Sequence, residues 1–154
     1  MIRIVRTDSQ NQDFIDLVKQ LDADLAEKNG NNHSFYAQFN KIDMLKHAIV
    51  LYENDKAIAC GAMKIFSSDS MEIKRMYTVP EARGKGMAAK VLMQLETWAN
   101  ELGYQKCVLE TGKKQPEAVS LYKKSGYIQT PNYGQYVGVE NSLCFEKIVK
   151  VIPK

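Results

Sequence analysis

Apolar residues recur along the first thirty positions with the spacing of a helix. Residues 11–28 carry an apolar side chain at every third or fourth position, which predicts an amphipathic helix that ends at Gly30. The members of this apolar stripe are Phe14, Leu17, Val18, Leu21 and Leu25. A second, short helix is expected over residues 34–40.

The pattern then changes to the short apolar runs of strands. Residues 47–52 and 57–66 are two such runs, and the polar residues between them predict a tight turn, so the pair should form an antiparallel hairpin. A helical stripe returns over residues 88–102 and ends at Gly103, and a further helix should open at Pro116 and end at Gly126. The remaining strands are expected over residues 2–5, 71–79, 106–111, 127–130 and 142–149.

These elements follow the order β-α-α-β-β-β-α-β-α-β-β, which predicts an α/β fold with a mixed sheet. No internal repeat, low-complexity tract or linker-like run interrupts the chain, so residues 1–154 are expected to form a single domain.

Composition excludes several classes of function. The chain of 154 residues is 45% hydrophobic and 25% charged, which is typical of a globular protein. Its net charge of +3 is spread along the chain without a basic run longer than a pair, so we expect no nucleic-acid partner. No apolar stretch approaches the length that spans a membrane, and no secretory leader is evident.

The three cysteines are an odd number and have no metal-ligand spacing. Each one lies in a strand-like apolar run, far from both histidines. We therefore expect reduced, buried thiols, no metal site and a cytoplasmic location.

The chemistry concentrates in residues 71–102, where a strand leads through a glycine-bearing turn into a long helix. Gly84 and Gly86 allow the backbone to turn sharply and to approach a ligand without a Cβ atom in the way. The helix that follows presents unpaired amides and the positive end of its dipole. This arrangement suits phosphate groups.

Two other interpretations of the same segment remain open at this point. One is a solvated turn at the start of a helix. The other is a dinucleotide fold, since Gly84, Gly86 and Ala89 also fit a GxGxxA pattern and Glu110 ends the next strand. Against it, the preceding strand carries three charged residues, whereas a doubly wound sheet has nearly continuous apolar strands. A Walker loop is excluded because its Lys–Ser/Thr pair is missing.

A wider pattern identifies a family. The motif Arg83-x-x-Gly86-x-Ala88 resembles the R/Q-x-x-G-x-G/A signature of the GNAT superfamily of N-acetyltransferases. The segments EIKRMYTVPEARGKGMAAKVL, LETG and QPEAVSLYKKSGY also look like that family's core segments, in the family's order. The resemblance covers about residues 45–150. It implies a GNAT-type acyl-CoA N-acyltransferase fold, with a mixed, mostly antiparallel sheet that is splayed between its fourth and fifth strands and flanked by helices.

The resemblance implies acetyl-CoA as co-substrate. The backbone of Met76, Tyr77 and Thr78 would pair with the pantetheine arm and donate an amide to the thioester carbonyl, although ordinary ladder pairing is the alternative. The pyrophosphate would be wrapped by Arg83, Gly84, Lys85, Gly86, Met87 and Ala88. Gln115 stands where many members carry an asparagine that bonds the pantetheine, so here the amide is one methylene longer.

Two residues match catalytic positions of the family. Tyr122 would protonate the leaving thiolate of coenzyme A, or hydrogen-bond to it. Its alternative role is a core aromatic, because it lies on the apolar stripe of its helix. Glu72 stands where several members carry a glutamate general base. Its alternative is an edge or solvent-facing glutamate. Glu110 is expected to be structural.

The expected reaction is direct attack of an acceptor amine on acetyl-CoA in a ternary complex. An acyl-CoA-binding module without turnover is the non-enzymatic alternative. We expect the acceptor to be the primary amine of a small metabolite, held by aromatic residues and acids such as Asp22, Asp24 and Glu27. The aromatic candidates for this site are Tyr36, Tyr133 and Tyr136. Members of the family often dimerise, so a homodimer is compatible with the resemblance.

Overall fold

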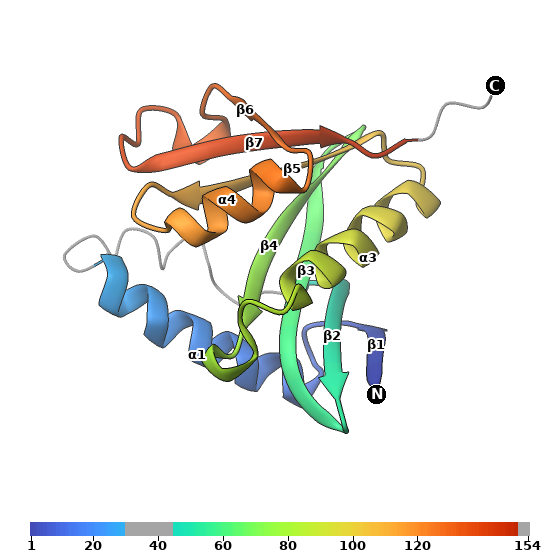
Figure 1. Ribbon diagram of the computed structural model, residues 1–154. Coiled ribbons are helices and arrows are strands. Elements are labelled where there is room, and N and C mark those ends of the chain that lie inside the picture. Colours follow the sequence, from blue (N-terminus) through green and yellow to red (C-terminus); the bar gives the residue numbers. More distant parts are fainter. Residues whose placement is uncertain (30–44, 151–154) are drawn as a thin grey trace. The chain divides into compact units, whose positions relative to one another are not determined.

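The computed structural model describes residues 1–29 and 45–150. Its seven strands are hydrogen-bonded in the order β1-β2-β3-β4-β5-β7-β6 (Figure 1). The strands are β1 (Ile2–Thr7), β2 (His47–Glu53), β3 (Lys56–Ser67), β4 (Ser70–Thr78), β5 (Lys106–Gly112), β6 (Ile128–Thr130) and β7 (Ser142–Ile148). The α-helices are α1 (Gln12–Asn29), α3 (Met87–Glu101) and α4 (Pro116–Lys124), and the short 3-10 turns are η2 (Pro80–Ala82) and η3 (Gly134–Tyr136).

The sheet is mixed and mostly antiparallel, as the sequence predicted. β4 and β5 pair in parallel, whereas β1 with β2, β2 with β3, β5 with β7 and β6 with β7 pair in antiparallel. The parallel ladder consists of three residue pairs, from Ser70–Lys106 to Glu72–Val108. This short ladder agrees with the expected splay between the fourth and fifth strands. The helix expected over residues 34–40 lies outside the described residues.

The chain divides into two compact units. Unit 1 comprises Met1–Lys64 and Lys74–Leu95, and unit 2 comprises Ile65–Ile73 and the chain from Glu96 onward. β3, β4 and α3 each contribute residues to both units.

The hairpin of unit 1 forms because its two turn residues adopt a left-handed backbone. Asn54 has φ of 51° and Asp55 has φ of 69°, and Glu53 pairs with Lys56 across the turn. Two left-handed residues give a turn whose twist matches that of the strands it joins, and asparagine and aspartate tolerate this conformation better than most residues. The predicted hairpin is therefore confirmed, with its turn at residues 54–55.

Helix α1 begins at a side-chain cap and buries one face. The Phe14 amide donates to the Asn11 Oδ1 atom at 3.0 Å, which satisfies one of the amides left open at the start of the helix. The predicted stripe then packs inward, with Phe14 and Val18 fully buried and Leu17 and Leu21 nearly so. The Tyr52 hydroxyl of β2 donates to Asp13 of α1 at 2.6 Å.

Strand β4 contains a residue with an unusual backbone. Arg75 has φ of 61°, a left-handed value that is uncommon for a non-glycine residue and irregular in the middle of a strand. Its side chain is 2% exposed, and its Nη1 atom lies 3.2 Å from the Asp22 Oδ1 atom of α1. This ion pair holds the irregular part of β4 against α1 within unit 1.

Unit 2 is organised around β5, which pairs with β7 along its whole length from Lys106 to Gly112. The Asp69 carbonyl oxygen accepts hydrogen bonds from the Gln105 and Lys106 amides at 2.9 and 3.2 Å, so the turn before β4 is joined to the start of β5. This contact sets the register in which Glu72 lies opposite Val108.

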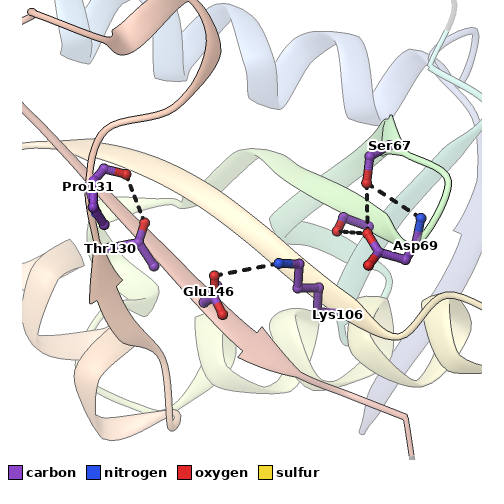
Figure 2. Close-up of polar contacts among 7 residues, drawn as sticks. Ser67, Asp69, Lys106, Thr130, Pro131 and Glu146 are labelled. Carbon is purple, nitrogen blue, oxygen red and sulfur yellow. Dashed lines mark hydrogen bonds and ion pairs between the residues drawn. The ribbon is translucent and has the colours of Figure 1, made fainter.

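The side chains of the same turn form a small polar cluster, which Figure 2 shows. The Ser67 and Ser70 hydroxyls donate to the Asp69 Oδ1 atom at 2.8 and 2.7 Å. These two hydrogen bonds, first that of Ser70 and then that of Ser67, lower the pKa of Asp69 below its ordinary value. Lys106 also pairs with Glu146 of β7 at 3.6 Å, across the ladder.

Gly61 of β3 allows Met76 and α3 to approach the strand. A Cβ atom at position 61 would lie 2.5 Å from the Met76 Sδ atom and 2.9 Å from the Val91 Cγ1 atom. Gly61→Ala should therefore force a shift in a packed region and lower the free energy of unfolding by about 1–3 kcal/mol, as measured by urea denaturation. In a Met76→Ala background the nearest obstructing atom is absent, so Gly61→Ala should lower the free energy of unfolding by a smaller amount. An equal cost in both backgrounds would contradict this account.

Candidate active site

The glycine loop after β4 belongs to unit 1, and backbone hydrogen bonds fix its start. The Val79 amide donates to the Ile58 carbonyl oxygen at 2.9 Å, and the Ala82 amide donates to the Val79 carbonyl oxygen at 3.0 Å. Pro80 occupies the first position of η2, where no amide donor is needed. The loop therefore leaves the strand in one defined direction.

The loop itself has the geometry that the sequence predicted for a phosphate site. Gly84 and Gly86 have φ of 78° and 81°, a backbone that other L-residues adopt only with strain. Apart from the adjacent residues, no atom of residues 1–29 and 45–150 lies within 4 Å of the place where a Cβ atom would stand on either glycine, so within this part of the chain the space beside the backbone is open. Helix α3 begins at Met87, and the amides of its first turn have no acceptor inside the helix. The residues present therefore fit an anionic group.

Arg83 contacts the protein on three sides. Its Nε atom donates to the Thr78 carbonyl oxygen at 2.9 Å, its Nη2 atom lies 3.7 Å from Asp24 Oδ2, and its guanidinium lies 5.5 Å from the centre of the Tyr77 ring. These contacts brace the loop against the end of β4. The other cation of the loop, Lys85, is exposed and lies between the two glycines.

The three residues expected to recognise the pantetheine arm lie at the end of β4. The side chains of Tyr77 and Thr78 are buried, and the Met76 Sδ atom lies over Gly61. The Thr78 Oγ1 atom is buried and has no hydrogen-bond partner within residues 1–29 and 45–150. With these side chains packed in unit 1, any pairing of this segment with a ligand falls to its backbone.

Two acids that the sequence suggested for holding an ammonium group are engaged by arginines. Asp22 pairs with the buried Arg75, and Asp24 pairs with Arg83. Both carboxylates therefore neutralise positive charges of β4 and of the glycine loop. This makes them less available to bind the ammonium group of an acceptor.

Unit 2 carries the candidate general base. Glu72 of β4 is 3% exposed, and its Oε2 atom accepts a hydrogen bond from the Tyr133 hydroxyl at 2.8 Å. Burial raises the pKa of Tyr133, and the Glu72 carboxylate raises it further, so the phenol keeps its proton at neutral pH. Glu72 is thus a buried acid with a defined partner, and the solvent-facing alternative is wrong.

Tyr133 is held by two aromatic neighbours. Its ring makes edge contacts with Phe66 at a centroid distance of 4.6 Å and with Tyr136 at 5.8 Å. Tyr136 is only 2% exposed, so it packs in unit 2 as a core residue, whereas Phe66 is 40% exposed and Tyr133 is partly exposed. Tyr36, the third aromatic candidate, lies outside the described residues.

Tyr122 is buried on α4. Its ring contacts Tyr127 at a centroid distance of 5.9 Å and Phe145 at 6.4 Å, and the whole residue is 6% exposed. Burial raises the pKa of Tyr122, and the negative charge of Glu110 adds to the effect. The phenol is therefore a neutral donor that gives up its proton less readily than tyrosine in water.

Gln115 stands at the junction of β5 and α4. Its backbone amide donates to the Gly112 carbonyl oxygen at 3.1 Å, and it precedes the helix without capping it by its side chain. Its Nε2 atom would lie 3.3 Å from a Cβ atom at position 112. The longer amide therefore lies against Gly112, at the end of β5.

The cysteines are all buried thiols. Burial raises the pKa of both Cys60 and Cys107 to about 12, and it also raises the pKa of Cys144. Since the thiolate is the nucleophilic form, none of the three is prepared for attack at neutral pH. Within the part of the chain that the structure describes, no cluster of ligands could hold a metal ion, and no helix has the length and apolar character to cross a membrane.

The pairing of Tyr133 with Glu72 is the feature that sequence reasoning missed. Both residues were singled out, but in separate roles, because 61 positions separate them and neither lies in a common motif. The only signal was the aromatic, glycine-bearing loop around Tyr133.

Comparison with known proteins agrees with the geometry. Residues 15–127 match the acetyltransferase (GNAT) family. An IAA acetyltransferase from Azospirillum brasilense is 28% identical over 150 residues, which are 95% of this chain and 97% of that protein. A Klebsiella pneumoniae structure assigned as an acyl-CoA N-acyltransferase has a TM-score of 0.79 at 27% identity, over 97% of this chain and 98% of that one.

A more distant structure has the same fold. The PaiA N-acetyltransferase of Thermoplasma acidophilum, in complex with coenzyme A, has a TM-score of 0.68 at 17% identity, over 96% of this chain and 99% of that one. The family match covers most of the chain and includes the glycine loop, which also decides against the dinucleotide interpretation. The chain therefore belongs to the acetyltransferase (GNAT) family and is an acetyl-CoA-dependent N-acetyltransferase.

Proposed function

We propose that this enzyme transfers the acetyl group of acetyl-CoA to the primary amine of a small metabolite, by direct attack in a ternary complex. The observation that carries the proposal is the buried Glu72 carboxylate, which is held by Tyr133 beside aromatic side chains. An ammonium group must lose a proton before its nitrogen can attack a thioester, and a fixed carboxylate is a suitable acceptor for that proton.

The co-substrate would be held mainly by backbone groups. Gly84 and Gly86 leave the space that a pyrophosphate needs, and the amides of Met87 and Ala88 open the helix behind them. Lys85 would add positive charge, while Arg83 would serve chiefly to brace the loop. The coenzyme A bound in the PaiA structure supports this choice of co-substrate.

The pantetheine arm would follow the backbone of residues 76–78, with Gln115 offering its amide. One amide of that strand segment would donate to the thioester carbonyl and stabilise the oxyanion that forms as the amine attacks. Because the side chains of Tyr77 and Thr78 are buried, this recognition depends little on their identity.

Tyr122 would act on the leaving thiolate. The pKa of Tyr122 is raised by burial, whereas that of a free thiol is about 8.5, so complete proton transfer from the phenol to sulfur is uphill. A hydrogen bond from the phenol to the developing thiolate has no such cost, and it strengthens as charge builds on sulfur. We therefore assign Tyr122 the role of a hydrogen-bond donor in the transition state.

The acceptor class follows from the groups around Glu72. Phe66 and Tyr133 present aromatic edges and faces, and together with a carboxylate they suit a small organic ammonium. The charged residues of the chain form no basic run that would attract a polyanion.

The surroundings of the reaction complete the proposal. The three free, buried thiols suit a reducing cytoplasm. Three elements contribute residues to both compact units, so we propose that residues 1–154 work as one GNAT domain. A homodimer is compatible with these features.

Gly86→Val should weaken acetyl-CoA binding by about tenfold or more, because a branched side chain would fill the space beside the loop. Isothermal titration with acetyl-CoA measures the effect. The matched control is Gly103→Val at the other end of α3, since Gly103 also has a positive φ and open space around it. Both variants carry the same type of backbone strain, and only Gly86→Val should lose affinity. If Gly86→Val binds acetyl-CoA as tightly as the wild type does, the glycine loop is not part of the acetyl-CoA site.

The acceptor class can be tested by release of free coenzyme A with lysine, spermidine, glucosamine and a lysine-containing peptide as acceptors. We expect turnover with at least one of the three small amines at matched concentration. Turnover of the peptide alone would contradict the small-metabolite assignment. Binding of acetyl-CoA without turnover of any amine would favour an acyl-CoA-binding module instead.

Tyr122→Phe should lower kcat roughly ten- to a thousandfold and leave the affinity for acetyl-CoA nearly unchanged. The substitution keeps the ring contacts with Tyr127 and Phe145 and removes only the hydroxyl. Steady-state kinetics and isothermal titration separate the two effects. If kcat is unchanged while chemistry is rate-limiting, Tyr122 is only a packing residue.

A further inference from the structure

The buried carboxylate of Glu72 is hydrogen-bonded to a partly exposed tyrosine. Glu72 is 3% exposed and lies inside β4, whereas Tyr133 is partly exposed and stands just before η3. The Tyr133 hydroxyl donates to the Glu72 Oε2 atom at 2.8 Å. An acceptor that approaches from solvent would therefore meet the phenol before the carboxylate.

We infer that Tyr133 relays the acceptor's proton to Glu72, an inference that rests on the proposed N-acetyltransferase function. In this step one ammonium N–H bond of the acceptor breaks, and its proton passes to the Tyr133 oxygen. The proton that Tyr133 already carries moves to Glu72 Oε2. The products are a neutral amine, a neutral Glu72 carboxylic acid and an unchanged tyrosine.

The protonation state of the phenol fits a coupled transfer. Burial raises the pKa of Tyr133, and so does Glu72, which means that a free tyrosinate is a costly intermediate. The two proton movements are therefore expected to occur together. Among the residues that the structure describes, Tyr136 and Cys144 also act on the Tyr133 phenol, and Glu110 acts on Tyr136. The Tyr136 phenol and the Cys144 thiol also remain neutral, because burial raises the pKa of each.

The position of the hydroxyl is fixed by packing. The Tyr133 ring is held between its edge contacts with Phe66 and Tyr136, and the Tyr133 backbone is extended, with φ of −116° and ψ of 164°. Gly134 follows with φ of 52°, and a Cβ atom there would lie 3.8 Å from the Phe66 ring. A relay needs its donor and acceptor atoms fixed at hydrogen-bond distance, and these contacts provide that.

The decisive variant is Tyr133→Phe, which keeps both ring contacts and removes only the hydroxyl. At about pH 7 we expect kcat with the best small amine of the panel to fall about a hundredfold, with KM for acetyl-CoA nearly unchanged. As the pH rises to about 9.5, more of the amine is already neutral in solution and needs no relay. The ratio of wild-type kcat to Tyr133→Phe kcat should therefore become smaller as the pH rises. If the substitution only damaged the structure, this ratio would stay the same at every pH.

Two comparisons make the test specific. Tyr104→Phe removes a hydroxyl from another partly exposed tyrosine of unit 2 and should keep wild-type kinetics across the pH range. Glu72→Gln should lower kcat, and adding Tyr133→Phe to it should cause little further loss, because both residues serve one step. Thermal unfolding and acetyl-CoA titration check that each variant is folded.

The outcomes separate the relay from the proposed function. If the wild-type protein releases coenzyme A with an amine and Tyr133→Phe matches it at about pH 7, the relay is wrong while the function stands. The relay would also be overturned if the fall in kcat of Tyr133→Phe is the same at every pH. It would equally be overturned if the effects of Glu72→Gln and Tyr133→Phe on kcat are fully additive in the double variant. If the wild-type protein acetylates none of the amines, the proposed function fails, and the relay fails with it.

Discussion

An ion pair of a buried arginine holds strand β4 in a shape that a regular strand would not adopt. Arg75 combines a left-handed backbone with a guanidinium removed from solvent, and each of these states costs free energy by itself. The Asp22 carboxylate, 3.2 Å away, offsets the buried charge, and the Cys60 thiol donates to the Arg75 carbonyl oxygen. Residues 76–78 and the glycine loop follow directly along the chain. Their orientation in unit 1 therefore depends on this one irregular residue.

Much of the fold was predictable because its elements carry clear periodic patterns. The strand expected over residues 71–79 is observed as Ser70–Thr78, and the helix expected over residues 88–102 is observed as Met87–Glu101. The turns η2 and η3 were not predicted, since three-residue elements are too short for a period to show. The left-handed backbone of Arg75 also has no signal in the sequence, because arginine has no preference for that conformation.

The candidate site divides along similar physical lines. The glycine loop was predictable because only glycine tolerates its backbone, so the residue type itself carries the information. Ion pairs and hydrogen bonds between side chains left no such signal in the sequence. Asp24 pairs with Arg83, and Tyr133 pairs with Glu72, across long stretches of sequence in which nothing marks the partners. The fold must be known before these charges and hydroxyls can be assigned to one another.

The burial of the three cysteines has a consequence for an enzyme that handles a thioester. A free thiolate exchanges acyl groups with thioesters, so an ionised cysteine near acetyl-CoA would become acetylated and would waste the co-substrate. At neutral pH the thiols of Cys60 and Cys107 are almost entirely protonated, since the pKa of each is raised to about 12. Low thiolate content and burial also slow oxidation to sulfenic acid. The same burial that fills the core thus protects these thiols from acetylation by acetyl-CoA and from oxidation by peroxide.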